Sequence, residues 1–312
     1  MNIKYIFFGY ANYMKVANNS ILNNENTIYY MPNEFRGIRC IVYYLFIWAV
    51  KYRLTSFIPY VLYEYLFCLK ELKKTDCIFF IFYEQSIGAI EKGILRRLRK
   101  TFLNSKFVFI FTNTLVSGVN KKQLDFIRNN RAIYDLVTTF NETDAEDNNF
   151  FYYDQVYSDI YAHDYKGIKS DVCFCGLDKG RKKLIEAIQN RLEKYGINCD
   201  FNIGTPEHKI PHEFITAKTA MTDCILEVLV DTSQPGSSLR VAEAIANKKK
   251  LLTNNPFIKN KPYFNTCQFS YFSSPEDIDI EFIKRKLDDS QFVDPEIVSP
   301  ERFLNFLRDT LS

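Results

Sequence analysis

Short apolar runs alternate with longer amphipathic segments along this chain, and the alternation occurs twice. In the first half, strand-like residues 76–82 and 106–111 flank a helical pattern at 86–102. In the second half, strand-like residues 171–175 precede a helical pattern at 181–195. Strands that alternate with helices form mostly parallel sheets covered by helices. The sequence therefore predicts an α/β protein with two Rossmann-like domains that face each other across a cleft.

The same patterns predict the remaining elements. In the first half they predict strands at 3–8 and 132–138, helices at 38–50, 57–72 and 124–129, and a short polar helix or turn at 141–149. In the second half they predict strands at 199–203, 223–230, 250–253 and 269–272, and helices at 237–247 and 300–311.

A change in composition marks the boundary between the two halves. Residues 150–157 are aromatic, and residues 158–170 are polar and irregular. A chain of 312 residues is long enough for two ordinary domains. We expect an acceptor-binding domain over 1–158, a donor-binding domain over 159–299, and a C-terminal helix over 300–312 that packs back on the first domain.

Cysteine spacing and the length of the apolar runs argue against a secreted protein and against a membrane-spanning one. The eight cysteines show no metal-binding spacing, which is typical of a reducing, cytoplasmic environment. No signal peptide is recognisable at the N-terminus. The uncharged runs at 40–50 and 54–63 are too short to span a membrane, which takes about 20 apolar residues. We expect a cytoplasmic protein without a transmembrane helix.

The first half also contains a basic, aromatic region. Residues 1–156 carry a net charge of +5, whereas the remaining residues carry −2. A run of five cations at 92–100 accompanies the aromatic helical patterns at 38–69. This combination predicts a peripheral contact with the anionic inner face of a membrane. The alternatives are that the apolar helices form the domain core and that the basic run is a solvated face.

A first candidate site lies in the stretch from Gly176 to Arg181. The stretch reads Gly-Leu-Asp-Lys-Gly-Arg, and it ends one predicted strand and opens the next helix. Glycine allows close approach to an anion, a helix N-terminus attracts one, and Lys179 and Arg181 add charged donors. This combination predicts a diphosphate-binding loop. The alternative is an ordinary turn capped by Asp178; neither a Walker loop nor a G-x-G-x-x-G motif is present.

A second candidate site follows the predicted strand at 223–230. Here a loop of small residues containing Ser237 and Ser238 leads into a helix and would present backbone N–H groups to an anion. Arg240 and Glu243 are three residues apart and share a helix face. A carboxylate at position 243 would be placed to accept both hydroxyls of a ribose. The alternative is an ordinary serine-capped helix with a surface Arg–Glu pair.

Together these two loops resemble the donor site of GT-B glycosyltransferases, in particular those that assemble bacterial lipopolysaccharide and capsule. The resemblance covers residues 171–256. It implies a nucleotide-sugar donor bound by Gly176 and the basic residues Lys179, Arg181 and Arg240. It further implies that Ser237 and Ser238 bind the diphosphate and that Glu243 binds the ribose. The implied acceptor is a glycan, or a lipid-linked glycan, of the lipopolysaccharide core, O-antigen or capsule.

One departure from the resemblance bears on mechanism. Many retaining members carry a second Glu eight residues before the ribose Glu, and here that position is Pro235. This favours inversion, unless Glu227 substitutes for the missing acid. The positive loops would stabilise the leaving diphosphate, so neither a metal ion nor another cofactor is expected.

An inverting transferase needs a general base near the acceptor hydroxyl. Glu84 follows the predicted strand at 76–82 and is the preferred candidate; Asp144 and His163 are the alternatives. Glu84 would otherwise be an acid that caps the next helix.

Two other classes of protein remain open from the residues alone. A nucleotide-sugar epimerase could use the same fold and the same diphosphate site. A non-catalytic module could bind nucleic acid or another anion through the basic, aromatic first half. The aromatic residues lie in apolar helical runs typical of buried positions, so we do not expect a nucleic-acid partner.

Overall fold

The computed structural model describes residues 2–9, 12–30, 35–52, 54, 59–84, 92–115, 121–159, 166–233 and 235–311. The chain divides into two compact units. Unit 1 comprises Met1–Lys15, Asn19–Tyr153 and Leu307–Ser312, and unit 2 comprises Val16–Asn18 and Asp154–Phe306. The chain therefore passes from unit 1 to unit 2 after Tyr153, near the composition change seen in the sequence, and returns to unit 1 within its last helix.

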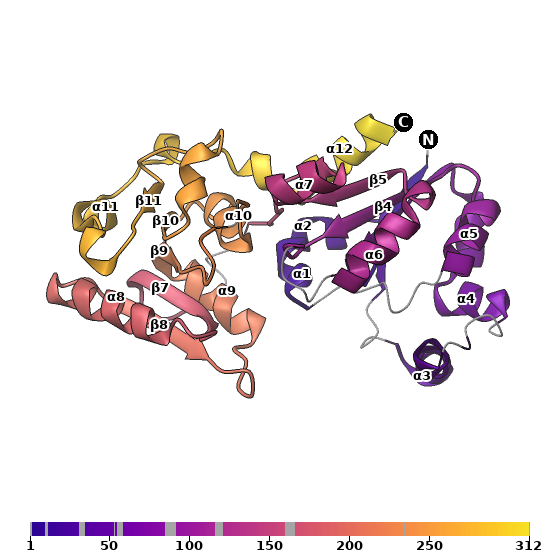
Figure 1. Ribbon diagram of the computed structural model, residues 1–312, viewed down its shortest axis with the longest axis horizontal. Helices are drawn as coiled ribbons and strands as arrows, with labels where there is room; N and C mark the ends of the chain where they lie inside the picture. Colours follow the sequence, from indigo (N-terminus) through magenta and orange to yellow (C-terminus); the bar gives the residue numbers. More distant parts are fainter. Residues whose placement is uncertain are drawn as a thin grey trace. The chain divides into compact units, whose positions relative to one another are not determined.

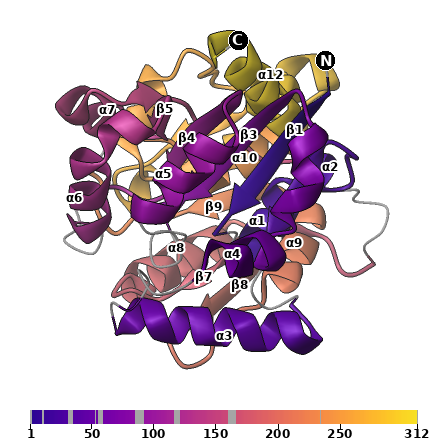
Figure 2. The same cartoon turned by 90° about the vertical axis from the view of Figure 1, so that its right-hand side faces the viewer.

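Unit 1 is built on a parallel sheet of six strands in the order β2-β1-β3-β4-β5-β6 (Figures 1 and 2). The strands are β1 (Ile3–Phe8), β2 (Thr27–Tyr30), β3 (Cys77–Tyr83), β4 (Ser105–Phe111), β5 (Leu136–Thr139) and β6 (Phe151–Tyr152). The strands predicted at 3–8, 76–82 and 106–111 are confirmed, whereas β2 and β6 were not predicted. The strand predicted at 132–138 starts later than expected, because residues 131–133 form a 3-10 turn.

Helices accompany this sheet. They are α1 (Asn12–Ala17, which ends in unit 2), α2 (Asn19–Leu22), α3 (Gly37–Lys51), α4 (Tyr60–Leu66), α5 (Lys92–Thr101), α6 (Lys121–Asn129) and α7 (Glu142–Asn148). The single helix predicted at 57–72 is wrong in its second half. Cys68 has a left-handed φ of 48°, which ends α4 and starts a 3-10 helix, Leu69–Lys74.

The two apolar helices predicted in this region differ in burial. In α4, Tyr63 and Leu66 are buried in the core of unit 1. In α3, Phe46 is buried, but Trp48 keeps 54% of its surface exposed. Large apolar side chains of α3 are exposed with it: Ile38, Ile41, Tyr44 and Leu45. The alternative in which both helices are simply core is therefore wrong for the outer face of α3, which lies beyond α4 at the margin of the unit (Figure 1).

Unit 2 is built on a parallel sheet of five strands in the order β11-β10-β9-β7-β8. The strands are β7 (Ser170–Leu177), β8 (Cys199–Gly204), β9 (Thr222–Glu227), β10 (Lys250–Thr253) and β11 (Phe269–Tyr271). The helices are α8 (Lys182–Lys194), α9 (His212–Ala220), α10 (Leu239–Ala246), α11 (Ile280–Lys284) and α12 (Pro300–Leu311, which ends in unit 1). Every predicted strand of this half is present, although the strand predicted at 223–230 ends three residues earlier, at Glu227, and α9 is an element that was not predicted.

The two units have different cores. Phenylalanines in edge-on contact, such as Phe80, Phe107 and Phe109, fill the core of unit 1. Smaller aliphatic residues such as Val172, Ile185 and Leu226 predominate in the core of unit 2.

All eight cysteines are free. No helix in the described part of the chain is both long and apolar enough to cross a membrane.

Candidate functional site

The sheet of unit 2 reverses its strand order at β7. From β7 the chain adds β8 on one side and then returns to add β9 on the other side. In open α/β sheets, ligands bind beyond the carboxyl ends of the strands at such a reversal. The two predicted loops both begin here, because the first follows β7 and the second follows β9. The structure therefore brings the two candidate loops to one edge of one sheet.

Arg181 lies across this reversal. Its Nε and Nη2 donate to the carbonyl oxygen of Leu177, at 3.2 and 3.0 Å, and its Nη1 donates to the carbonyl oxygen of Val228. The guanidinium also stacks on Phe174, 5.2 Å from the ring centroid. One side chain therefore joins the end of β7 to the residue that follows β9.

Gly176 makes this position of Arg181 possible. A Cβ at residue 176 would lie 3.0 Å from Nη2 of Arg181 and 3.1 Å from Cζ of Phe174. Both contacts are closer than side chains normally allow, so any larger residue would have to displace the guanidinium or the ring. The glycine predicted to let an anion approach closely thus has a second role, which is to admit an arginine.

The turn between β7 and α8 is a regular structure with an exposed cation. Lys179 and Gly180 adopt left-handed φ angles of 47° and 83°, and the Lys179 side chain is exposed. Asp178 accepts a hydrogen bond from the backbone N–H of Lys182 at 2.9 Å. The capped turn considered as an alternative is present, and it holds Lys179 beside the N-terminus of α8.

Arg240 is the second arginine at this edge. Its Nη2 donates to the carbonyl oxygen of Cys175 at 2.7 Å, and its Nη1 is bonded to Glu243 Oε2. The side chain of Arg240 is 24% exposed and that of Glu243 is 2% exposed. The pair is therefore an internal ion pair tied to β7, and the alternative of a surface pair is wrong.

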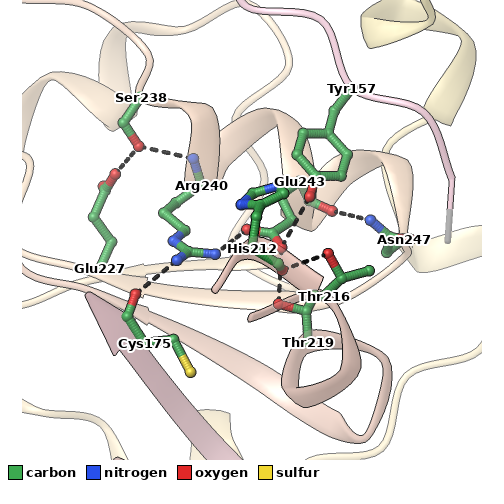
Figure 3. A network of polar contacts seen from close by, with 10 residues as sticks. All are labelled: Tyr157, Cys175, His212, Thr216, Thr219, Glu227, Ser238, Arg240, Glu243 and Asn247. Carbon is green, nitrogen blue, oxygen red and sulfur yellow. Dashed lines mark hydrogen bonds and ion pairs between the residues drawn. The ribbon is translucent and has the colours of Figure 1, made fainter. Parts of the chain in front are cut away.

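A wider polar network surrounds Glu243 (Figure 3). Thr219 donates to its Oε1 at 2.8 Å, and the hydroxyl of Tyr157 donates to the same atom at 3.3 Å. His212, at the start of α9, lies beside the Arg240–Glu243 pair (Figure 3). The sequence reasoning missed Tyr157, Thr219 and His212, because α9 was not recognised as a helix and because Tyr157 was assigned to the acceptor-binding domain over 1–158, whereas it belongs to unit 2.

The serine loop is held by its own hydroxyl groups. Ser238 caps α10 by accepting from the N–H of Arg240 at 3.0 Å, and its hydroxyl donates to Glu227. Ser237 is 2% exposed, and its hydroxyl is 2.6 Å from that of Tyr263. The hydroxyls of both serines are therefore engaged inside the protein. What this loop offers a ligand is the set of backbone N–H groups at the start of α10.

Glu227 is buried at the end of β9. It accepts hydrogen bonds from Ser238 and Thr253 and is 4% exposed. Glu227 was considered either as a substitute for the missing catalytic Glu or as a buried, paired acid. Its burial and its two hydrogen bonds are those of a buried, paired acid. Pro235, which stands where the resemblance would imply a second Glu, is half-buried in the loop.

Burial and charge act together in this cluster. Burial, and then the like charge of Arg240, lower the pKa of Arg181. Burial is the largest single influence on the pKa of Arg240 and lowers it, but Glu243, Tyr157 and Cys173 together outweigh burial and raise that pKa. Burial raises the pKa of Glu227, against its hydrogen bonds and the two arginines. The cations therefore stay charged, with partners already in place.

This arrangement is suited to binding an anion. Each guanidinium has five N–H donors, and the carbonyl and carboxylate contacts leave some of them available. Two helix N-termini and Lys179 add further positive potential at the same edge. A group with two adjacent phosphates could contact both arginines at once.

Comparison with known proteins gives a likeness of fold. No family model matches the sequence, and no curated protein matches it. Two solved structures of an alpha-glucosyltransferase match the whole chain at 9% identity. One, in complex with UDP and a 13-mer DNA containing a central A:G mismatch, covers 100% of both chains with a TM-score of 0.54. The other, in complex with UDP and a 13-mer DNA containing a HMU base, covers 99% of both with a TM-score of 0.51.

The chain has a GT-B fold. A trehalose-phosphate synthase from Burkholderia vietnamiensis is also similar over 99% of this chain and 96% of that one, at 12% identity and a TM-score of 0.43.

In the first unit of this GT-B fold, Glu84 lies at the carboxyl end of β3. The order of the sheet reverses between β1 and β3, so Glu84 occupies the corresponding edge of its own sheet. It is 4% exposed and accepts hydrogen bonds from Thr112, at 2.9 Å, and from Asn113. Burial raises the pKa of Glu84, and these two hydrogen bonds act in the opposite direction.

The two alternative bases have different outcomes. Asp144 is 2% exposed and accepts a hydrogen bond from the backbone N–H of Leu115 at 2.9 Å. Its carboxylate therefore holds the segment that follows β4 in place. Burial raises its pKa as well. His163 lies outside the described residues.

The described cations of the basic helix α5 have different surroundings. Arg99 donates to the carbonyl oxygens of Ser105 and Ile133 and pairs with Asp135 at 2.7 Å, so it anchors the helix to the sheet. Arg96 and Arg97 are exposed, and Arg97 stacks 4.5 Å from the ring centroid of Tyr60. Lys100 is exposed with them.

Within the described residues, no three His, Cys, Asp or Glu side chains gather closely enough to hold a metal ion.

Proposed function

We propose that the protein is a glycosyltransferase that moves a sugar from a nucleoside-diphosphate sugar to an acceptor hydroxyl. The observation that carries the proposal is the meeting of Arg181, Arg240 and Glu243 where the strand order of unit 2 reverses. Similarity in fold to two UDP-bound alpha-glucosyltransferases supports it. In this proposal unit 2 binds the donor and unit 1 binds the acceptor.

The donor is bound mainly through its diphosphate. Arg181 and Arg240 neutralise the two phosphates, while Lys179 and the N-terminus of α10 complete the anion site. The carboxylate of Glu243 accepts the ribose hydroxyls, which requires it to exchange a hydrogen bond from Tyr157 or Thr219 for one from the sugar. Because these cations are already fixed by backbone contacts, little reorganisation is needed when negative charge develops on the leaving group.

We propose an inverting reaction. The acceptor oxygen attacks the anomeric carbon, and the bond from that carbon to the phosphate oxygen breaks. The electron pair of that bond leaves with the nucleoside diphosphate. The carboxylate of Glu84 takes the proton of the acceptor hydroxyl. Thr112 and Asn113 hold that carboxylate in a fixed orientation. The arginines and helix N-termini stabilise the diphosphate, so we expect turnover to persist when metal ions are chelated.

The acceptor we propose is a lipid-linked glycan of bacterial surface-polysaccharide assembly. The outer face of α3 supports this, because contiguous exposed apolar side chains mark interaction sites. A cavity of about 170 Å³ between α3 and α4 is lined by Val42, Leu45, Phe46, Leu62, Tyr63 and Leu66. The exposed cations Arg96, Arg97 and Lys100 on α5, next to α4, match an anionic leaflet.

A second acceptor class is favoured by a separate observation. The two alpha-glucosyltransferase structures that match the whole chain were both solved with DNA. If duplex DNA is the acceptor here, sugar should be transferred to oligonucleotide without any lipid carrier.

The test of the proposal is a donor panel followed by transfer. Thermal unfolding is measured with UDP, GDP, dTDP and CMP, and the one that stabilises the protein identifies the nucleotide; a ligand at 100 times its Kd adds about 2.7 kcal/mol. The matching sugar nucleotide is then incubated alone, with a lipid-linked glycan and with duplex DNA. Transfer only when an acceptor is present supports the proposal. Conversion of the donor alone indicates an epimerase, and the absence of nucleotide binding contradicts both.

A further inference from the structure

Unit 2 has a cavity at the edge of its sheet opposite the proposed donor site, where β7, β9 and β10 begin. The cavity has a volume of about 500 Å³. Its lining includes seven cationic residues: Lys169, Lys248, Lys249, Lys250, Lys284, Arg285 and Lys286. Only two acidic residues, Asp171 and Asp223, line it as well. None of these residues belongs to the proposed donor site, which lies at the carboxyl ends of the same strands.

Lys250 fixes the cationic segment that forms one wall of this cavity. It is 5% exposed, and its Nζ donates to the carbonyl oxygens of Phe282 (3.1 Å), Ile283 and Arg285 (2.7 Å). These carbonyls lie at and just beyond the end of α11, so the ammonium ties that end to the start of β10. The exposed residues Lys284, Arg285 and Lys286 are therefore held in place by a buried contact.

The remaining cations converge on the same space. Lys249 is half-buried and donates to the carbonyl oxygen of Ala220 at 3.2 Å, and burial lowers its pKa. Lys169 is exposed at the rim. Lys248 pairs with Asp289 at 3.3 Å. Buried and exposed cations thus surround a single concavity.

Acidic groups compensate this charge only in part. Asp171 accepts a hydrogen bond from the backbone N–H of Asn198 at 2.7 Å, and Asp223 is exposed. Like charges that face each other across a concave surface raise the local potential and attract anions. Scattered surface lysines would avoid this repulsion, so the convergence itself requires an explanation.

We propose that this cavity binds a compact organic polyanion with two or more phosphate groups, such as a nucleoside triphosphate. Its volume is within the range of about 300–1,000 Å³ typical of small-molecule sites. Arg285 can bind a phosphate in a bidentate manner, while the lysines act as point charges. A nucleic-acid strand is expected to bind along a stripe of cations. Here the cations surround one concavity instead of forming a stripe. The proposal does not depend on the proposed function, because it uses the other edge of the sheet.

The test is calorimetric titration with inorganic triphosphate at low salt. The wild type, a cavity variant and a control variant are compared, so that binding in this cavity is separated from binding at the other edge of the sheet. Lys284→Ala combined with Lys286→Ala removes two exposed cations and leaves the Lys250 anchor intact. The matched control is Lys183→Ala combined with Lys194→Ala, which removes two exposed lysines of α8.

We expect the cavity variant to lose at least about tenfold in triphosphate affinity, because it lacks two of the charged hydrogen-bond donors that line the cavity. The control variant should bind as the wild type does, and nucleotide should bind the donor site of the cavity variant with unchanged affinity. Equal losses in the cavity and control variants, or no triphosphate binding by the wild type, would overturn the proposal. Tighter binding of duplex DNA than of triphosphate, lost in the cavity variant, would also overturn it in favour of a nucleic-acid surface.

Discussion

Arg181 and Arg240 donate hydrogen bonds to carbonyl oxygens two residues apart on the same strand, those of Leu177 and Cys175. The ladder between β7 and β9 runs only from Ser170 opposite Thr222 to Cys173 opposite Ile225. Beyond it, the two guanidinium groups bind the carbonyls at the end of β7. The cations that we propose for the diphosphate are therefore part of the backbone structure of this sheet edge.

Gly176→Ala should disturb this edge, because the added methyl would lie against the Arg181 guanidinium and the Phe174 ring. We expect a loss of about 1–3 kcal/mol in the free energy of unfolding together with weaker nucleotide binding. Urea unfolding and nucleotide titration measure the two effects. Gly167→Ala is the control, because its added Cβ would meet only Met221, at 4.0 Å. Unchanged nucleotide affinity in Gly176→Ala would show that the position of Arg181 is irrelevant to the ligand.

Glu243→Gln should cost far more stability than the loss of a surface charge. It leaves Arg240 largely buried without its carboxylate, and removing one partner of a buried pair costs about 3–5 kcal/mol. The control is Glu186→Gln, which breaks the exposed pair with Lys182 on α8 and should cost less than about 0.5 kcal/mol. A double-mutant cycle of Arg240 and Glu243, followed by urea unfolding, measures the coupling; a value near zero would contradict the internal ion pair.

Glu84→Gln should lower kcat by about 10²–10⁴-fold and leave donor affinity unchanged, because it removes the proposed base but preserves the shape of the side chain. The control is Asp144→Asn, which alters the other buried acid among the described residues of unit 1 and should keep near wild-type kcat. Single-turnover kinetics separate chemistry from binding. The opposite ranking of the two variants would transfer the role of base to Asp144.

Glu84 should also set the acidic limb of the pH–rate profile. The base acts when deprotonated, and burial raises the pKa of Glu84. Activity should therefore fall at a pH above the ordinary Glu value of about 4.3 as the solution is acidified. In Glu84→Gln this limb should disappear from the residual activity.

Glu227→Gln should alter how stability depends on pH. Burial raises the pKa of Glu227, so the folded state binds this proton more tightly than the unfolded state does. Its contribution is complete below the ordinary Glu pKa and is lost as the pH rises through the higher folded-state value. The variant should therefore gain stability relative to the wild type as pH increases through this window. Urea unfolding over a pH series tests this, and a constant difference would contradict it.

Trp48 lies on the exposed face of α3 and is the only tryptophan of the chain. Its fluorescence therefore reports on the surroundings of that face. Vesicles containing anionic lipid should shift its fluorescence to the blue, more strongly at low salt than at high salt. Ile41→Glu combined with Leu45→Glu should abolish the shift. Ile168→Glu combined with Tyr195→Glu, two exposed apolar side chains of unit 2, should leave it unchanged. No shift with any vesicle would exclude the membrane contact.

The pattern of apolar residues predicted most strands, because parallel strands buried on both faces form continuous apolar runs. It did not predict α9, whose buried residues are Thr216, Thr219 and Ala220. Small and hydroxyl-bearing side chains on the buried face give no hydrophobic period, so the partner of Glu243 on this helix could not be recognised.

Other features depend on contacts between distant segments. Lys179 and Arg181 are equivalent cations in the sequence, yet one is exposed and the other binds Leu177 and Val228. That difference follows from the end of the β7–β9 ladder, which local sequence does not encode. The outer face of α3 is similar: a helix that is apolar all round does not indicate which side is covered.

The division of the chain into units has a consequence for limited proteolysis. Unit 1 combines Met1–Lys15, Asn19–Tyr153 and Leu307–Ser312, while unit 2 takes Val16–Asn18 from between the first two of these stretches. Burial raises the pKa of Tyr5 in β1, and the charge of Arg308 in α12 opposes that rise, so the end of α12 lies near the first strand of unit 1. A single cut after Tyr153 would leave Leu307–Ser312 attached to unit 2 and Val16–Asn18 attached to unit 1. Neither unit can therefore be released whole by one cut.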